Sequence, residues 1–329
     1  QYRDLATATH QLHGWYSHRY VLLQSDTERQ TEGHGETEGS APSGSMSWCD
    51  LLCTDPTKAD WVAQATVFFS HAWSLKFREV VSALQQLASQ RPDDAEQIYF
   101  WFDVCCVNQH VSHIVPPEWW STTFQSAISA IGNTVMMLSP WDQPVVLTRS
   151  WCLWELFCTA AAEGTRFSMC LCPSQLAALE LALKSNPSAV LNAISRIDVQ
   201  NAQAGQETDR AAILRAVEST PNGVEGINQL AMQEVRKWLL QTARRLMSES
   251  DLLGDAAAET TPSYTEQSVL EGHLLSVCLG HYLGAWSDAL TLLRPVAAGY
   301  EGLMGTHSQQ ALGARNQLAV ATEACGDLP

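Results

Sequence analysis

The sequence predicts an α/β protein built on a parallel β-sheet and followed by an all-helical segment. Between residues 61 and 172, short apolar runs bounded by turn residues alternate with stretches of helical periodicity. Strands that alternate with helices in this way form parallel sheets covered by helices on both faces. Beyond residue 173 the patterns are mostly helical. We therefore expect one sheet domain and one helical segment.

Four apolar runs are the predicted strands of the sheet. They are short and rich in β-branched and aromatic residues, which is typical of buried strands, and they cover residues 65–70, 97–103, 134–138 and 166–171. Strands of a sheet covered on both faces are almost continuously apolar. We therefore expect five side chains to be buried in this sheet, those of Val67, Phe69, Phe100, Val135 and Met137.

Three amphipathic helices are predicted between these strands. Residues 75–90 and 119–131 have apolar positions at helical spacing, and a third helix begins after Thr148-Arg149-Ser150. Thr148 or Ser150 is the expected N-cap of the third helix.

The predicted domain order is as follows. Residues 1–60 form an N-terminal extension, in which residues 24–47 are rich in Glu, Gly, Ser and Thr and are expected to be disordered. The sheet domain covers residues 61–247 and ends in a long helix packed on the sheet, and residues 248–264 are a linker. Helix-hairpin repeats fill residues 265–329, since Gly284 and Gly326 stand 42 residues apart at the ends of helical patterns.

Composition limits the classes of function. The chain has 329 residues and a formal net charge of −16, which argues against binding to nucleic acid or to anionic membranes. No apolar run reaches the ~18 residues of a membrane span, and no secretory signal pattern is present. We expect a cytoplasmic protein with its ten cysteines reduced. Because it does not begin with Met, the chain is expected to be part of a longer protein.

Polar residues follow the predicted strands where a site is expected. Ligands of open parallel sheets bind at the carboxyl ends of the strands. Trp151 and Glu155 share a face of the helix that starts at this edge, because they are four residues apart. The candidate site residues are Ser70, His71, Trp73, Asp103, Ser139, Trp151 and Glu155.

Alternatives remain open for several of these and neighbouring side chains. Asp103 ends a strand, where acidic residues commonly cap loops, and Trp151 sits on a helix with a large apolar face. Cys152 is either a packing residue or a thiol activated by the helix N-terminus. His110 and His113 have no carboxylate or thiol pattern beside them, so no metal site is predicted.

Several of these stretches together resemble a known family. ATVFFSHAW, YFWFD, FQSAISAIGNTVMMLSP and SWCLWEL are similar to segments of Toll/interleukin-receptor (TIR) domains of the plant and microbial type, over residues 62–172. The most specific stretch is SWCLWEL, which follows a strand that ends in Ser. The tail, GYEGLMGTHSQQALGARNQLAVATEACGDL, resembles the tetratricopeptide repeats of kinesin light chains.

The resemblance implies a flavodoxin-like fold and hydrolysis of NAD, as substrate rather than cofactor, at its nicotinamide–ribose bond. It places the essential glutamate at Glu155, in a Trp-x-x-x-Glu pattern with Trp151, and puts residues 70–73 at the same pocket. The chain departs from the family in having His71-Ala72-Trp73 where many members carry an aromatic residue, Arg and Gly. The resemblance also implies self-association through the TIR-like domain and a protein or peptide partner for the repeats.

The chemistry is consistent with a single carboxylate. Cleavage expels neutral nicotinamide from a cationic substrate, so no general acid is needed, and a carboxylate can stabilise the oxocarbenium-like transition state. The indole of Trp73 or Trp151 can stack on nicotinamide or adenine. Glu155 is expected to be a partly exposed helix residue whose replacement hardly changes stability.

Three functions are compatible with the sequence. The first is an NAD-cleaving enzyme that releases linear or cyclised ADP-ribose and is regulated by its repeats. The second is a non-catalytic adaptor that self-associates, and the third is a nucleotide-binding sensor without turnover. Trp151 and Glu155 favour the enzyme, whereas the altered loop at residues 70–73 favours the adaptor.

Overall fold

A computed structural model describes residues 19–20, 46–58, 61–89, 98–110, 117–194, 200–220, 222–253 and 264–326. Nearly all of the predicted disordered segment 24–47 lies outside these residues. The chain divides into two compact units. The first comprises residues 1–138, 146–172 and 199–227, and the second comprises residues 139–145, 173–198 and 228–329.

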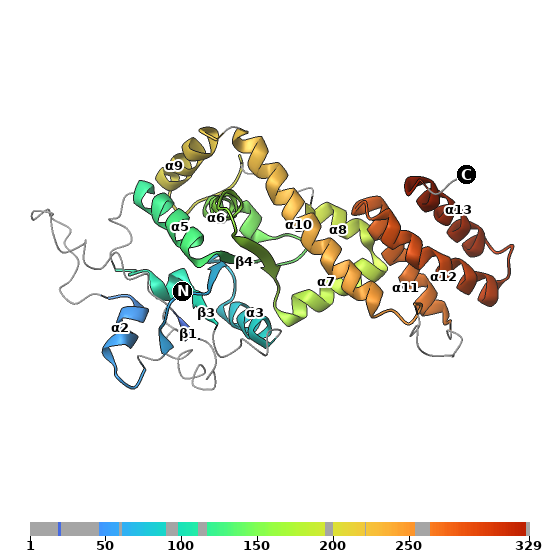
Figure 1. Cartoon of the computed structure of the whole chain (residues 1–329), viewed down its shortest axis with the longest axis horizontal. Coiled ribbons are helices and arrows are strands. Elements are labelled where there is room, and N and C mark those ends of the chain that lie inside the picture. The colour runs from blue at the N-terminus through green and yellow to red at the C-terminus, as the bar shows by residue number, and fades with distance from the viewer. Residues whose placement is uncertain are drawn as a thin grey trace, which may run out of the picture. The chain divides into compact units, whose positions relative to one another are not determined.

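The first unit contains a parallel sheet with the strand order β1-β3-β2-β4-β5 (Figure 1). All four predicted strands are present, and the two-residue β1 pairs with β3 at the edge. The strands are β1 (Arg19–Tyr20), β2 (Val67–Ser70), β3 (Tyr99–Trp101), β4 (Asn133–Met137) and β5 (Arg166–Cys170). The four predicted strands have the order second-first-third-fourth, which is compatible with a flavodoxin-like core.

The helices of this unit surround the sheet and the carboxyl ends of its strands. Those described are α2 (Trp48–Thr54), α3 (Phe77–Ser89), α4 (Asp103–Cys106), α5 (Pro117–Ile131), the 3₁₀ helix η4 (Val145–Thr148), α6 (Ser150–Ala161) and α9 (Glu207–Glu218). The predicted caps of α6 are wrong. Its N-cap is Arg149, whose side chain makes no capping hydrogen bond.

The two faces of the sheet are covered by different helices, because side chains alternate along each strand. Phe69 and Phe100 belong to one apolar cluster with Leu84 of α3. On the other face, Phe68 stacks on Trp101 with ring centroids 4.6 Å apart and meets the edge of Phe124 of α5. The five predicted core residues are at most 1% exposed, which confirms the buried sheet.

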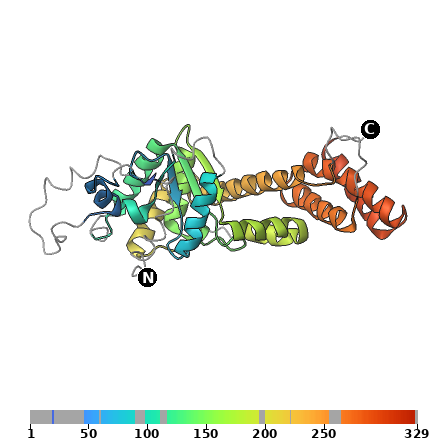
Figure 2. The ribbon, with the colours of Figure 1, turned by 90° about the horizontal axis from the view of Figure 1, so that it is seen from below.

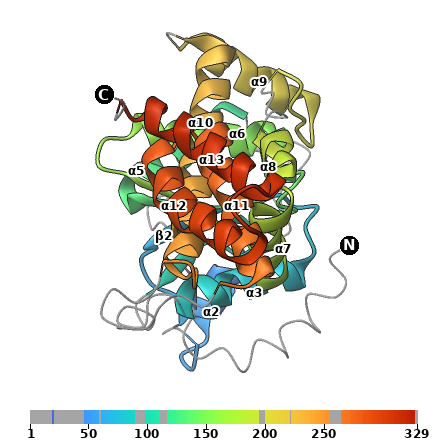
Figure 3. The same cartoon turned by 90° about the vertical axis from the view of Figure 1, so that its right-hand side faces the viewer.

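The regular secondary structure in the described residues of the second unit is helical. It contains α7 (Pro173–Ser185), α8 (Pro187–Ile194), most of α10 (Gly223–Ser248), α11 (Glu266–Val277), the π-helix η5 (Cys278–Tyr282), α12 (Trp286–Met304) and α13 (Gln309–Ala324). Figures 2 and 3 show α11, α12 and α13 packed side by side. No helix in the described part of the chain is long and apolar enough to cross a membrane.

The boundary between the units differs from the predicted one. Most of residues 173–247, expected to complete the sheet domain, group with the C-terminal helices instead. Ion pairs contribute to this grouping: Lys184 Nζ of α7 lies 3.8 Å from Glu271 Oε2 of α11, and Arg244 Nε of α10 lies 2.8 Å from Asp288 Oδ2 of α12. The sequence did not reveal these pairs because their members are 44 or more residues apart.

The close approach of α11 and α12 predicts opposite effects for two glycines of α12. A Cβ at Gly299 would lie 2.6 Å from Cγ2 of the fully buried Val269, whereas nothing lies within 4 Å of a Cβ at Gly302. We expect Gly299→Ala to lower the free energy of unfolding by about 1–3 kcal/mol. Gly302→Ala should raise it by up to about 1 kcal/mol, because alanine favours the helix. Urea titration followed by circular dichroism measures both, and equal effects would contradict the packing described.

Candidate functional site

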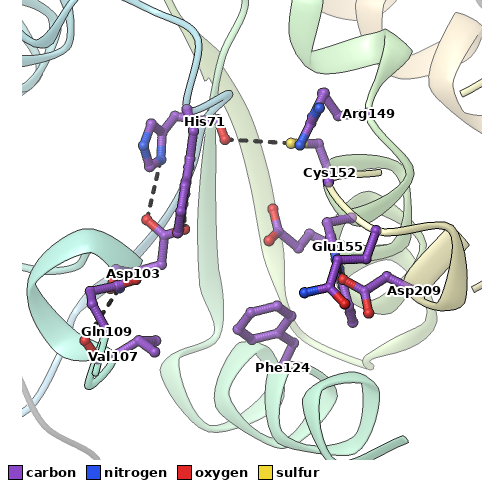
Figure 4. Close-up of a pocket in the computed structure, with 13 residues that line it drawn as sticks. His71, Asp103, Val107, Gln109, Phe124, Arg149, Cys152, Glu155 and Asp209 are labelled. Atoms are coloured by element: carbon purple, nitrogen blue, oxygen red, sulfur yellow. Dashed lines mark hydrogen bonds and ion pairs between the residues drawn. The ribbon is translucent and has the colours of Figure 1, made fainter. Parts of the chain in front are cut away.

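A pocket of about 280 Å³ lies in the first unit, at the carboxyl ends of β2 and β3 and beside α6 (Figure 4). Residues from five regions of the sequence converge there. The residues that line it are His71, Trp73, Asp103, Val107, Gln109, Phe124, Arg149, Trp151, Cys152, Glu155, Gly205, Gln206 and Asp209. Five of the seven predicted site residues are among them.

The other two predicted residues do not line the pocket. Ser70, the last residue of β2, is buried with its hydroxyl near the Glu155 carboxyl. It therefore influences Glu155 without lining the pocket itself. Ser139 is not among the residues that line the pocket and groups with the second unit. There its carbonyl accepts a hydrogen bond of 3.3 Å from the Val145 N–H and closes the loop of residues 139–145.

Asp103 organises one wall of the pocket. It is the first residue of α4, a short helix that the sequence did not predict. The Trp73 indole donates a 2.5 Å hydrogen bond to Asp103 Oδ2, and His71 Nδ1 lies 3.6 Å from Oδ1. Burial lowers the pKa of His71 despite the nearby carboxylate, so His71 is neutral at pH 7. Asp103 therefore fixes the orientation of Trp73, which stays half exposed.

Trp151 forms the opposite wall and is fixed in a similar way. Its indole donates a 3.3 Å hydrogen bond to Asp209 Oδ2 of α9, and its ring packs edge-on against Phe124 at 5.4 Å. Trp151 and Glu155 both line the pocket, as expected from their spacing on α6. Two tryptophans, each held by an aspartate, thus face a common pocket.

Glu155 is buried, not partly exposed as predicted. The residue is only 8% exposed, and its Oε2 has no hydrogen-bond partner in the described part of the chain. Burial raises the pKa of Glu155 to about 8, and the Asp103 charge acts in the same direction. The Ser70 hydroxyl opposes this shift without forming a hydrogen bond of regular geometry. With this pKa, Glu155 is mainly protonated at neutral pH.

Sequence reasoning missed the contribution of α9 and its preceding loop. The Gln203 N–H donates a 2.8 Å hydrogen bond to the Thr148 carbonyl, and the Ser150 N–H donates one of 2.9 Å to the Gln203 carbonyl. These bonds bring the start of α9 beside the start of α6, where Arg149 and Asp209 line the pocket. Local sequence patterns do not predict a backbone pairing between residues more than 50 positions apart. Arg149 could have been found from the sequence, because it stands two residues before Trp151.

The structure also decides between the alternatives for Cys152. Its Sγ packs 3.5 Å from the His71 carbonyl, and burial raises the pKa of this thiol well above its usual range. Cys152 is a packing residue, and the activated-thiol alternative is wrong. All ten cysteines are free thiols.

Metal ligands do not gather at the pocket. Among the residues that the structure describes, no group of three His, Cys, Asp or Glu side chains could hold a metal ion. His113, one of the two histidines considered in the sequence, lies outside those residues.

Comparison of the chain with family models, with curated proteins and with solved structures finds no match. The resemblance to TIR domains and tetratricopeptide repeats stays a prediction. The geometry of the pocket is therefore the basis for inferring its function.

The buried carboxyl of Glu155 predicts a stability that depends on pH. Because its pKa is about 8 in the folded chain and near 4.5 when unfolded, the folded state binds the extra proton between these values. The contribution of Glu155 to the free energy of unfolding is therefore greatest below pH 4.5 and falls as the pH rises to about 8, by on the order of 1 kcal/mol per pH unit. Glu155→Gln should lose this slope, and the exposed Glu163→Gln at the end of α6 should keep it. Parallel urea-unfolding curves against pH for parent and Glu155→Gln would contradict the assignment.

Proposed function

We propose that the pocket binds NAD and hydrolyses its nicotinamide–ribose bond, with Glu155 as the catalytic carboxylate. The observation that carries the proposal is the buried Glu155 Oε2, which lines a pocket and has no hydrogen-bond partner among the described residues. The carboxylates of Asp103 and Asp209 each accept a hydrogen bond from an indole. Of these three acids, Glu155 is the one with a buried carboxyl oxygen that lacks a hydrogen-bond partner in the described part of the chain.

A buried acid of this kind suits a cationic substrate. The positive charge of the nicotinamide ring favours the ionised form of a neighbouring carboxyl, so substrate binding lowers the pKa of Glu155. As the C1′–N bond breaks, its electron pair neutralises the ring and positive charge moves onto the ribose. The Glu155 carboxylate then stabilises the ribosyl cation in a site of low dielectric. Water bonds to C1′ and loses a proton, which yields nicotinamide and ADP-ribose.

The aromatic walls fit the two flat rings of the same substrate. Trp73 keeps half of its surface exposed while Asp103 holds its N–H, so the indole can stack without being reordered. Trp151 is held by Asp209 and Phe124. Preorganised groups of this kind reduce the entropy lost on binding.

The adaptor alternative gives no role to the buried carboxyl. An unsatisfied buried polar group costs about 1–3 kcal/mol, and an interaction module has no need of it. The burial of Glu155 thus favours a ligand-binding site over a purely structural position.

Glu155→Gln tests the catalytic role. The variant keeps the size of the side chain and removes its charge, so nicotinamide release from NAD should fall by about 10²–10³-fold. Glu163→Gln, the same change at an exposed position, should leave the rate unaltered. Nicotinamide is followed by liquid chromatography. The protein is held together through a dimerising tag at its C-terminus, because the resemblance implies that the TIR-like domain self-associates. Equal release by parent and Glu155→Gln would remove Glu155 from the mechanism, and no release by the assembled parent would favour the adaptor.

The pH profile gives a second test of the same residue. If catalysis needs the ionised carboxylate, kcat/KM should rise about tenfold per pH unit below the pKa of about 8 and level off above it. The value of kcat/KM increases with pH because the ionised, active form of Glu155 accumulates as the pH approaches the raised pKa. The residual activity of Glu155→Gln should lack this rising limb. A flat profile for the parent between pH 6 and 8 would show that ionisation of Glu155 does not limit the reaction.

A further inference from the structure

We propose that Arg149 is the specificity-determining residue that binds a phosphate group of the substrate. This inference rests on the proposed function and names the part of the substrate that the site requires. Arg149 supplies the one guanidinium among the residues that line the pocket. It comes from the start of α6, not from the loop after β2, where the resemblance implies an arginine that this chain lacks.

The charges in the pocket leave Arg149 available. Three acidic residues share the pocket with it, yet Arg149 forms no ion pair with a carboxylate in the described ranges. Asp103 and Asp209 accept hydrogen bonds from Trp73 and Trp151. A planar guanidinium with free donors matches the oxygens of a phosphate in a bidentate arrangement.

The backbone around Arg149 reinforces this end of the pocket. Arg149 is the N-cap of α6 and Gln206 is the N-cap of α9, and neither helix start is capped by a side-chain hydrogen bond. The carboxylate of Glu207, in the first turn of α9, lies 3.0 Å from Arg210 and does not cap its own helix. The dipole of α6 adds to the positive charge of the guanidinium and favours an anion, although the Ser150 N–H is taken by the Gln203 carbonyl and Asp209 places a carboxylate in the first turn of α9.

The spacing along α6 separates this anion subsite from the catalytic carboxyl. Arg149 precedes Glu155 by six residues, which is about 9 Å of helix rise. Figure 4 shows Arg149 on the Cys152 side of the pocket and Glu155 directed into it. A ribose held at Glu155 would carry its 5′-phosphate toward Arg149. The substrate class is therefore a nicotinamide nucleotide, which bears at least one phosphate, and not the unphosphorylated nucleoside.

Three substrates separate phosphate recognition from cleavage itself, namely NAD, nicotinamide mononucleotide and nicotinamide riboside. Arg149→Ala should lower kcat/KM for the two phosphorylated substrates by about 10- to 100-fold and leave nicotinamide riboside unchanged. Arg149→Lys, which keeps the charge and loses the bidentate geometry, should show a smaller loss. Arg166→Ala is the matched control, because Arg166 is exposed at the amino end of β5. An equal loss for all three substrates would overturn the phosphate assignment.

Binding of ADP-ribose, measured by calorimetry, decides the proposal independently of turnover. This ligand has both phosphates and no bond to cleave. Weaker binding by Arg149→Ala than by Arg166→Ala, with the urea midpoints of both variants at the parent value, would support the phosphate subsite even if NAD were not cleaved. Equal binding by the two variants, or no binding by the parent, would overturn it. Failure of the subsite is thus distinguished from failure of the proposed reaction.

Discussion

Desolvation of one carboxyl is the constraint on which the rest of the site depends. Glu155 lies on a helix packed against the sheet, and the Thr159 hydroxyl of the same helix donates a 2.9 Å hydrogen bond to Thr134 of β4. This packing removes Glu155 from water and raises its pKa. An acid placed in this way is mainly protonated at neutral pH, and a positive charge beside it favours the ionised form. The fold thereby couples the charge state of the site to its occupancy.

The strand order explains why the pocket lies where it does. β2 is central, with β3 on one side and β4 on the other, so the connection that leaves β2 toward β3 diverges from the one that leaves β4 toward β5. Such a divergence opens a crevice at the carboxyl ends of the strands. His71 and Asp103 come from one side of it and Glu155 from the other. Helices on both faces then hold these walls in fixed positions.

Patterns in the sequence predicted the features that depend on local order and on the burial of apolar strands. The strands followed from apolar runs, and the shared face of Trp151 and Glu155 followed from helical spacing. What failed depends on long-range contacts. Ser139 does not line the pocket, because the chain passes into the other unit after Leu138. Asp209 and its helix were missed because backbone bonds at Gln203 bring them to the pocket. The burial of Glu155 was missed because a charged residue on a helix is ordinarily exposed.

The two ends of the pocket carry opposite electrostatic character, and this division is the most specific property of the site. Arg149, at the start of α6, makes one end positive. Toward Glu155, three acids and the indoles of Trp73 and Trp151 make a surface that suits a flat cation. A ligand that joins an anionic group to an aromatic cation through a sugar would satisfy both ends at once. A ligand with either group alone would leave one end unsatisfied, so under the proposed function the pocket would discriminate against partial substrates.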